Sequence, residues 1–304
     1  MTGSVRSLTP WVRGRRHRTY QHVSVFISWG LLTAAVAVAE AQAERPDRGI
    51  ILFSDLITRA APEGVMLFAG GAHRWSLDGR SPEAALQHAQ LGLTLGVNPA
   101  YGSLSAHAEA APLPFLVLRG SYELQAFYGG FGTLLSFSDP EADFSPSALQ
   151  ARSGEEVSGF AHRFSGQSTL RAKAGFMLFR ARTSLHHFRF SKGGPLIYEF
   201  EFDTLLERND AVFEQDVAVL LEPWSGPDGG TFLIGPAYDI SRTLESGITR
   251  QRASAQMVWL MPRRWLGPAN ARLYGQLGAL IEARNRSAGD FFGVVGFGAD
   301  FNLF

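Results

Sequence analysis

The sequence predicts an all-β protein, a transmembrane antiparallel up-and-down β-barrel of about twelve strands, within a range of about ten to fourteen. Three observations predict it: an export segment at the N-terminus, long segments in which apolar and polar residues alternate, and an unusual composition. The 304 residues include 33 glycines, 23 phenylalanines and no cysteine. So many glycines and aromatic residues favour strands and turns over helices.

The export segment comes first. Five arginines within residues 6–18 precede an uncharged, largely apolar stretch at 23–39, which is followed by the small-residue site Ala41-x-Ala43. This order is typical of a cleaved signal peptide, predicted here as residues 1–43. The alternative is an uncleaved anchor, because the apolar stretch has the minimum length for a span. Its alanine-rich composition and polar interruptions favour cleavage.

Composition excludes several functions. The formal net charge is zero, so the sequence gives no general case for binding nucleic acid. The absence of cysteine removes disulfides and thiolate ligands or nucleophiles. No HExxH, EF-hand or P-loop pattern occurs, and we expect neither a metal site nor a cofactor.

Alternation with period two predicts the strands. In residues 88–97, Leu91, Leu93, Leu95 and Val97 alternate with polar or glycine residues, which is typical of a strand with one apolar face. The predicted strands are 64–76, 86–97, 102–111, 113–128, 130–138, 167–190, 195–206, 210–222, 231–242, 247–261, 270–284 and 290–304.

The expected domain organisation is simple. After the signal peptide, residues 44–63 form an N-terminal periplasmic segment and residues 64–304 form one barrel. Residues 139–166 are polar and rich in proline, serine and glycine, so they are expected to form a long external surface loop.

The polar face decides between a soluble β-sandwich and a membrane barrel. It carries both signs of charge along with amides and glycines, as the lumen wall of a membrane barrel does. A soluble periplasmic β-barrel or sandwich remains an alternative. The predicted lumen charges are Arg119, Glu123, Arg171, Lys173, Glu199, Glu201, Asp203, Arg250 and Arg252, together with Glu214, Asp216, Arg272, Glu282 and Arg284.

The final segment, "DFFGVVGFGADFNLF", resembles the closing strand of the bacterial outer-membrane β-barrel class, in which chains often end in phenylalanine after alternating apolar residues. The resemblance implies an outer-membrane location. It also implies contact with outer-membrane lipid, periplasmic chaperones and the barrel-assembly machinery, which would read Phe297, Phe301, Leu303 and Phe304 as an assembly signal. Phe304 is one residue out of phase with the other three, so strict alternation turns it inward unless a bulge intervenes.

One set of residues has the chemistry of a hydrolase. Ser105, His107 and Glu109 share one face of the strand predicted at 102–111, and they are the residue types of a catalytic triad. Same-face neighbours lie about 6.6 to 7 Å apart, too far for serine and histidine to meet reliably. A polar lumen wall explains them better, and the same holds for Ser184 and His186.

The predicted function is therefore a narrow or plugged pore for small solutes, or a structural envelope protein, since about twelve strands leave little open lumen. A lipid-active barrel hydrolase is the alternative. With a periplasmic C-terminus, the turns at 223–230 and 262–270 fall on the periplasmic side, where connections should be short.

Overall fold

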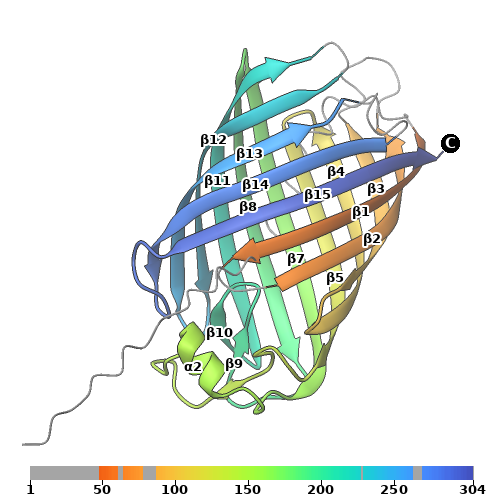
Figure 1. Ribbon diagram of the computed structural model, residues 1–304. Coiled ribbons are helices and arrows are strands. Elements are labelled where there is room, and N and C mark those ends of the chain that lie inside the picture. The colour runs from red at the N-terminus through yellow and green to blue at the C-terminus, as the bar shows by residue number, and fades with distance from the viewer. Residues whose placement is uncertain (1–47, 61–63, 78–86, 227–228, 263–268, 304) are drawn as a thin grey trace, which may run out of the picture.

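The computed structural model describes residues 48–60, 64–77, 87–226, 229–262 and 269–303. Twelve antiparallel strands close into one barrel, because β1 pairs both with β2 and with the last strand, β15 (Figure 1). The predicted fold class and strand number are confirmed. The barrel strands are β1 (Arg48–Ala60), β2 (Gly64–Ser76), β3 (His88–Val97), β4 (Tyr101–Leu113), β5 (Leu116–Tyr128), β7 (Ser158–Ala174), β8 (Met177–Phe190), β11 (Asn209–Ser225), β12 (Thr231–Thr243), β13 (Thr249–Leu260), β14 (Ala269–Ala283) and β15 (Phe291–Leu303).

The barrel wall is apolar outside and largely polar inside. On β3, Leu91, Leu93 and Leu95 are exposed by 56%, 60% and 62%, whereas His88 and Gln90 are buried. Successive residues of a strand point to opposite faces, so the leucines form the outer surface and the polar residues line the interior. An apolar outer surface suits a lipid surround and would be costly in water.

The two ends of the barrel differ. The start of β1 and the end of β15 lie together, with Ile50 opposite Leu303, and we call this the terminus end. Two connections there are very short, Pro114–Phe115 and Gly175–Phe176, and Gly175 has the positive φ of 58° that favours glycine. The opposite end carries the two long connections of the barrel wall, residues 129–157 and 191–208.

These two long connections form the cap. It contains β6 (Ser136–Phe137), α2 (Pro146–Ala151), β9 (Leu196–Glu199) and β10 (Thr204–Glu207), and β9 pairs with both β6 and β10. Figure 1 shows it at the lower end of the barrel. Among the described residues, no helix is long and apolar enough to cross a membrane. The cap has its own apolar core with one residue from the 244–248 connection: Leu135, Phe137, Phe144, Leu196, Tyr198, Leu205 and Ile248.

One barrel strand lies where none was predicted. β1 falls within residues 44–63, which were expected to form a periplasmic segment outside the barrel. Its inward face mixes Ile51, Asp55, Ile57 and Arg59, so apolar residues occur on both faces and the alternation is obscured. The barrel therefore begins at residue 48, and the predicted boundary at residue 64 is wrong. The predicted signal peptide lies outside the described residues.

Four predicted elements between residues 130 and 206 are also wrong. Residues 130–138 and 195–206 belong to the cap rather than to the barrel wall. Residues 167–190 form parts of two strands, because β7 turns into β8 at Gly175 with no polar turn sequence to mark it. The expected loop at 139–166 ends at residue 157, where β7 begins. The correct total of twelve thus arose because two false strands, at 130–138 and 195–206, offset the missed β1 and the merging of β7 with β8.

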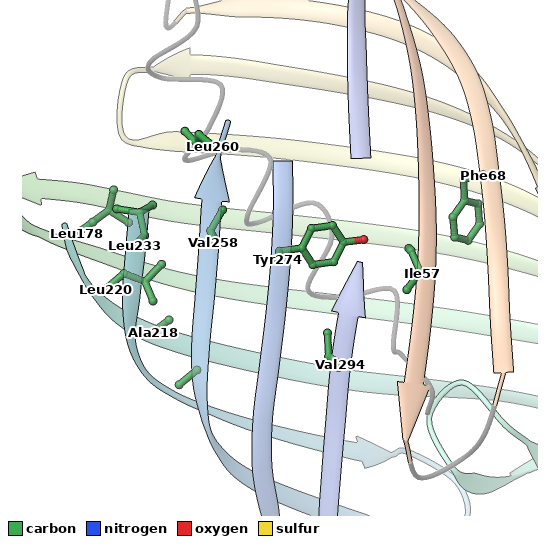
Figure 2. Packing of buried hydrophobic residues seen from close by; sticks show 11 residues of the cluster. Ile57, Phe68, Leu178, Ala218, Leu220, Leu233, Val258, Leu260, Tyr274 and Val294 are labelled. Atoms are coloured by element: carbon green, nitrogen blue, oxygen red, sulfur yellow. The ribbon is translucent and has the colours of Figure 1, made fainter. Parts of the chain in front are cut away.

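The barrel interior contains an apolar row in addition to its charges. Ile57 lies opposite Gly296, which lies opposite Tyr274; Tyr274 lies opposite Val258, and Val258 opposite Leu233. Figure 2 shows these buried side chains together with Leu178, Leu220, Leu260, Phe68 and Val294. The Tyr274 ring lies directly over Gly296, where an added Cβ would be 2.1 Å from Tyr274 Cζ. The row fills part of the interior that the sequence predicted to be polar.

Candidate functional site

The candidate site is the turn that joins β9 to β10, residues Phe200–Asp203, which we call the mouth turn. Its Glu201, Phe202 and Asp203 are exposed by 5% or less. Side chains from several barrel strands reach it, so it occupies the opening of the barrel at the cap end. Four-residue turns usually lie at the surface, and burial of this one requires partners for its polar groups.

Arginines of the wall bind the backbone of the mouth turn. Arg59 on β1 donates from Nη2 to the carbonyl oxygens of Phe200, at 2.9 Å, and Glu201, at 2.6 Å. Arg250 on β13 donates from Nη1 to the carbonyl oxygen of Phe202. These guanidinium groups therefore satisfy three buried carbonyl groups that the short hairpin leaves unpaired.

The Glu201 carboxylate binds the opposite part of the wall. It accepts hydrogen bonds from Tyr101 Oη at 2.5 Å, from Gln125 Nε2 at 3.4 Å and from Arg163. Arg163 also donates to Glu123, so one buried cation joins a carboxylate of the wall to one of the mouth turn. A charge-assisted hydrogen bond of this kind is about twice as strong as a neutral one.

Asp203 holds the end of the mouth turn. Its carboxylate accepts hydrogen bonds from Tyr198 Oη at 2.7 Å, Asn285 Nδ2 at 2.9 Å and Arg286 Nε at 2.7 Å. Burial by itself would raise the pKa of Asp203, but the charge and hydrogen bond of Arg286 outweigh it and lower the pKa below the usual value of 3.8. Asp203 is therefore a charged anchor between the cap and the β14–β15 connection.

Glu199, at the end of β9, has the opposite environment. Burial, and then the nearby charge of Glu201, raise the pKa of Glu199 from 4.5 to about 7. Its Oε2 accepts a hydrogen bond from the Phe202 backbone N–H at 2.7 Å, whereas its Oε1 is buried without a partner among the described residues. Glu199 is thus a titratable group within the cap.

Farther inside, arginines of the wall pair with carboxylates one or two strands away. Arg180 binds Asp216 through contacts of 2.6 to 3.1 Å, and Arg252 binds Asp239 at 2.6 Å. Arg272 bridges two carboxylates, Asp55 at 2.8 Å and Asp300 at 2.9 Å. Cross-strand pairing compensates the cost of burying these charges.

The structure divides the predicted lumen charges into three groups. Glu123, Arg171, Arg250 and Arg252 are buried on the inner face of the wall. Arg119 is partly exposed and lies 3.6 Å from Glu109, and the exposed Lys173 binds Glu222 at 2.5 Å. Glu199, Glu201 and Asp203 are buried in the cap and its mouth turn rather than on a barrel strand, because residues 195–206 leave the wall. The further predictions on the inner wall are Glu214, Asp216 and Arg272, whereas Glu282 and Arg284 are exposed.

Four arginines that face the barrel interior were not predicted to do so from the sequence. Arg59 lies in the segment excluded from the barrel, and Arg163 in the segment assigned to a loop. Arg180 and Arg182 face inward, but a single continuous strand over 167–190 would point them outward. The glycine at 175 is the signal that could have divided this strand and reversed their assignment.

The predicted hydrolase residues are not arranged as a triad. Ser105 and His107 are buried on the inner face of β4, and no hydrogen bond joins them among the described residues. Glu109 Oε1 instead lies 3.1 Å from Nε2 of His88 on β3. Of the second pair, Ser184 is buried and His186 Nδ1 lies 2.8 Å from Ser165 Oγ on β7.

The predicted assembly signal lies on the closing strand. Phe297 and Phe301 are exposed by 40% and 42% on the outer face of β15. Leu303 is paired through its backbone with Ile50 of β1, and Phe304 lies outside the described residues. The two phenylalanines contribute to the apolar outer surface at the seam where the barrel closes.

No protein-family model matches the sequence, and no curated protein is detectably similar to it. Similar solved structures include the translocator domain of the autotransporter NalP from Neisseria meningitidis, with a TM-score of 0.45 and 11% identity over 90% of this chain and 95% of that chain. The β domain of the Bordetella autotransporter BrkA gives 0.43 and 10% identity, with 85% and 99% covered. The Acinetobacter baumannii outer membrane protein Omp33 gives 0.38 and 9% identity, with 85% and 100% covered. Similarity this distant says nothing about activity. The described strands themselves show a closed twelve-stranded antiparallel β-barrel, and no individual family is identified.

Proposed function

We propose that the chain is an outer-membrane protein that forms a narrow channel for small solutes, and that the mouth turn restricts its outer opening. The binding of the mouth turn by wall arginines carries this proposal. A barrel that served only as an envelope anchor would have no need for a buried polar turn held by Arg59, Arg163 and Arg250. The paired charges of the inner wall support passage of polar solutes rather than of lipid.

The proposed orientation places the terminus end in the periplasm and the cap outside the cell, as is usual for barrels of this class. The mouth turn then controls entry from outside. The apolar row centred on Tyr274 and Val258 narrows the interior farther along the path. Solutes would therefore meet a polar restriction first and an apolar one second.

Conductance in planar bilayers tests the channel. The wild-type barrel is expected to be mostly closed, with rare openings. Replacing both Arg59 and Arg250 with alanine should increase the open fraction, because both side chains bind the carbonyl oxygens of the mouth turn. A double variant that folds, inserts and still never conducts would reject the channel and leave a plugged structural barrel.

The hydrolase alternative has its own test. Incubation of the inserted protein with phospholipid or lipid A vesicles would reveal fatty acid release. Activity that disappears in His107→Ala would establish the enzyme despite the separation of Ser105 from His107. The geometry described above predicts no such loss.

A further inference from the structure

We infer that the outer surface of the barrel near the cap binds an outer-leaflet lipid with a phosphorylated headgroup, through Arg189 and Arg242. The inference rests on the proposed outer-membrane location but not on the channel. Among the described side chains, Arg189, Arg242 and Lys192 are the cations that form neither a hydrogen bond nor an ion pair. All three are exposed.

The position of the two arginines coincides with the edge of the apolar surface. Arg189 is one residue from the end of β8, and Arg242 one residue from the end of β12, both at the cap end. Lys192 follows two residues after β8 but lies over the inner face of β7, its Cβ 3.6 Å from where a Cβ on Gly159 would be, so it is not part of this surface. Arg189 shares its outward face with Leu185, which is exposed by 46%, so the charge lies at the boundary between an apolar belt and the cap. Long cationic side chains at such a boundary reach toward lipid headgroups.

The spacing of the two arginines suits a large anionic headgroup. Arg189 lies opposite Asn209 of β11, and Arg242 lies opposite Phe213 of the same strand. Two strand spacings and four residues along β11 separate their backbones by about 16 Å. The intervening outward position on β11 is Ala211. Its small side chain leaves room for a headgroup between the two arginines.

A lipid fits this surface better than a free anion. Phe213, which lies opposite Arg242, and Leu185, four residues farther from the cap than Arg189, are exposed by 37% and 46% and offer apolar contacts for acyl chains. On the cap side of the arginines, the exposed carboxylates nearest in sequence, Glu207 and Glu245, form no ion pair with any of the three cations. Phosphate groups of an outer-leaflet glycolipid would neutralise the cations while its acyl chains cover the apolar face.

Lipid binding to the full-length barrel in neutral phosphatidylcholine nanodiscs tests the inference. The probes are bis-phosphorylated lipid A, the same lipid after phosphatase treatment, and inorganic phosphate alone. We expect the phosphorylated lipid to bind, with an affinity that falls as salt rises, and the dephosphorylated lipid to bind much more weakly. Arg189→Gln combined with Arg242→Gln should weaken binding about 30-fold, from roughly fivefold for each cation near a charged surface.

The matched control is Arg284→Gln, which removes another exposed arginine at the cap end whose charge is already paired with Glu141. It should leave lipid binding unchanged. Equal binding of the double variant and the wild type, or equal binding of both lipids, would overturn the inference. If inorganic phosphate bound as tightly as the lipid, the arginines would form a simple anion site and the inference of a lipid site would be wrong. None of these outcomes depends on conductance, so failure here is distinguishable from failure of the channel.

Discussion

Replacing Glu201 with glutamine should release the mouth turn from the wall. The substitution keeps the shape of the side chain but removes the negative charge that faces Arg163. Hydrogen bonds to charged groups contribute roughly 1.5 to 3 kcal/mol each, and Arg163 retains its pair with Glu123. We therefore expect the conformation in which the mouth turn is bound to the wall to be destabilised by about 2 kcal/mol. This change lowers the ratio of closed to open states about 30-fold.

Two measurements check this effect. Single-channel recordings give the ratio of closed to open time, and hydrogen exchange gives the protection of the β9 and β10 amides whether or not the barrel conducts. Glu155→Gln is the matched control. Glu155 is an exposed cap residue whose ion pair is with Arg152 and not with a residue of the mouth turn. If Glu201→Gln folds but matches the wild type in both measurements, the ion pair with Arg163 does not hold the turn.

Three further predictions concern packing, pH and assembly. Gly296→Ala should lower the free energy of unfolding by roughly 1 to 3 kcal/mol because its Cβ would meet the Tyr274 ring, whereas Gly120→Ala, with open space around it, should be neutral in the same heat-unfolding assay on gels. The pKa of Glu199 is raised from 4.5 to about 7, so its contribution to cap stability is fully present below about pH 4.5 and is lost as the pH rises through about 7. Hydrogen exchange of the β9 amides should therefore accelerate over this range, and Glu199→Gln should remove this pH dependence. Phe301→Gln, which replaces an outward ring at the closing seam, should reduce the yield of heat-modifiable barrel in membranes, and an unchanged yield would contradict a role in assembly.

The sequence predicted the wall of the barrel well where alternation was clean. β3 was predicted within two residues at each end, because its leucines face outward while polar residues or glycine face inward. β1 was missed for a physical reason, since its inner face takes part in the apolar row through Ile57. A strand with apolar residues on both faces has no period of two for a sequence pattern to detect.

The candidate site was less predictable than the wall. Residues 195–206 alternate as a strand does, yet their apolar residues pack in the cap and their acidic residues meet the wall. Nothing local distinguishes these situations, because the partners of Glu201, namely Tyr101, Gln125 and Arg163, lie 38 to 100 residues away. Glu199, Glu201 and Asp203 are buried, but in the cap and its turn rather than on the barrel strand predicted to carry them, and that placement depends on tertiary contacts.

The pairing of β1 with β15 has a consequence for the order in which the barrel forms. A hydrogen bond across this seam joins Thr58 to Val295, residues 237 positions apart, so the first strand cannot obtain its second partner until the last strand is in place. Contacts of such long range form slowly, and until they do both edge strands expose unpaired backbone groups that invite association with other chains. The edge of β1 is therefore open to aggregation for as long as this strand waits for β15, and closure of the barrel ends that exposure.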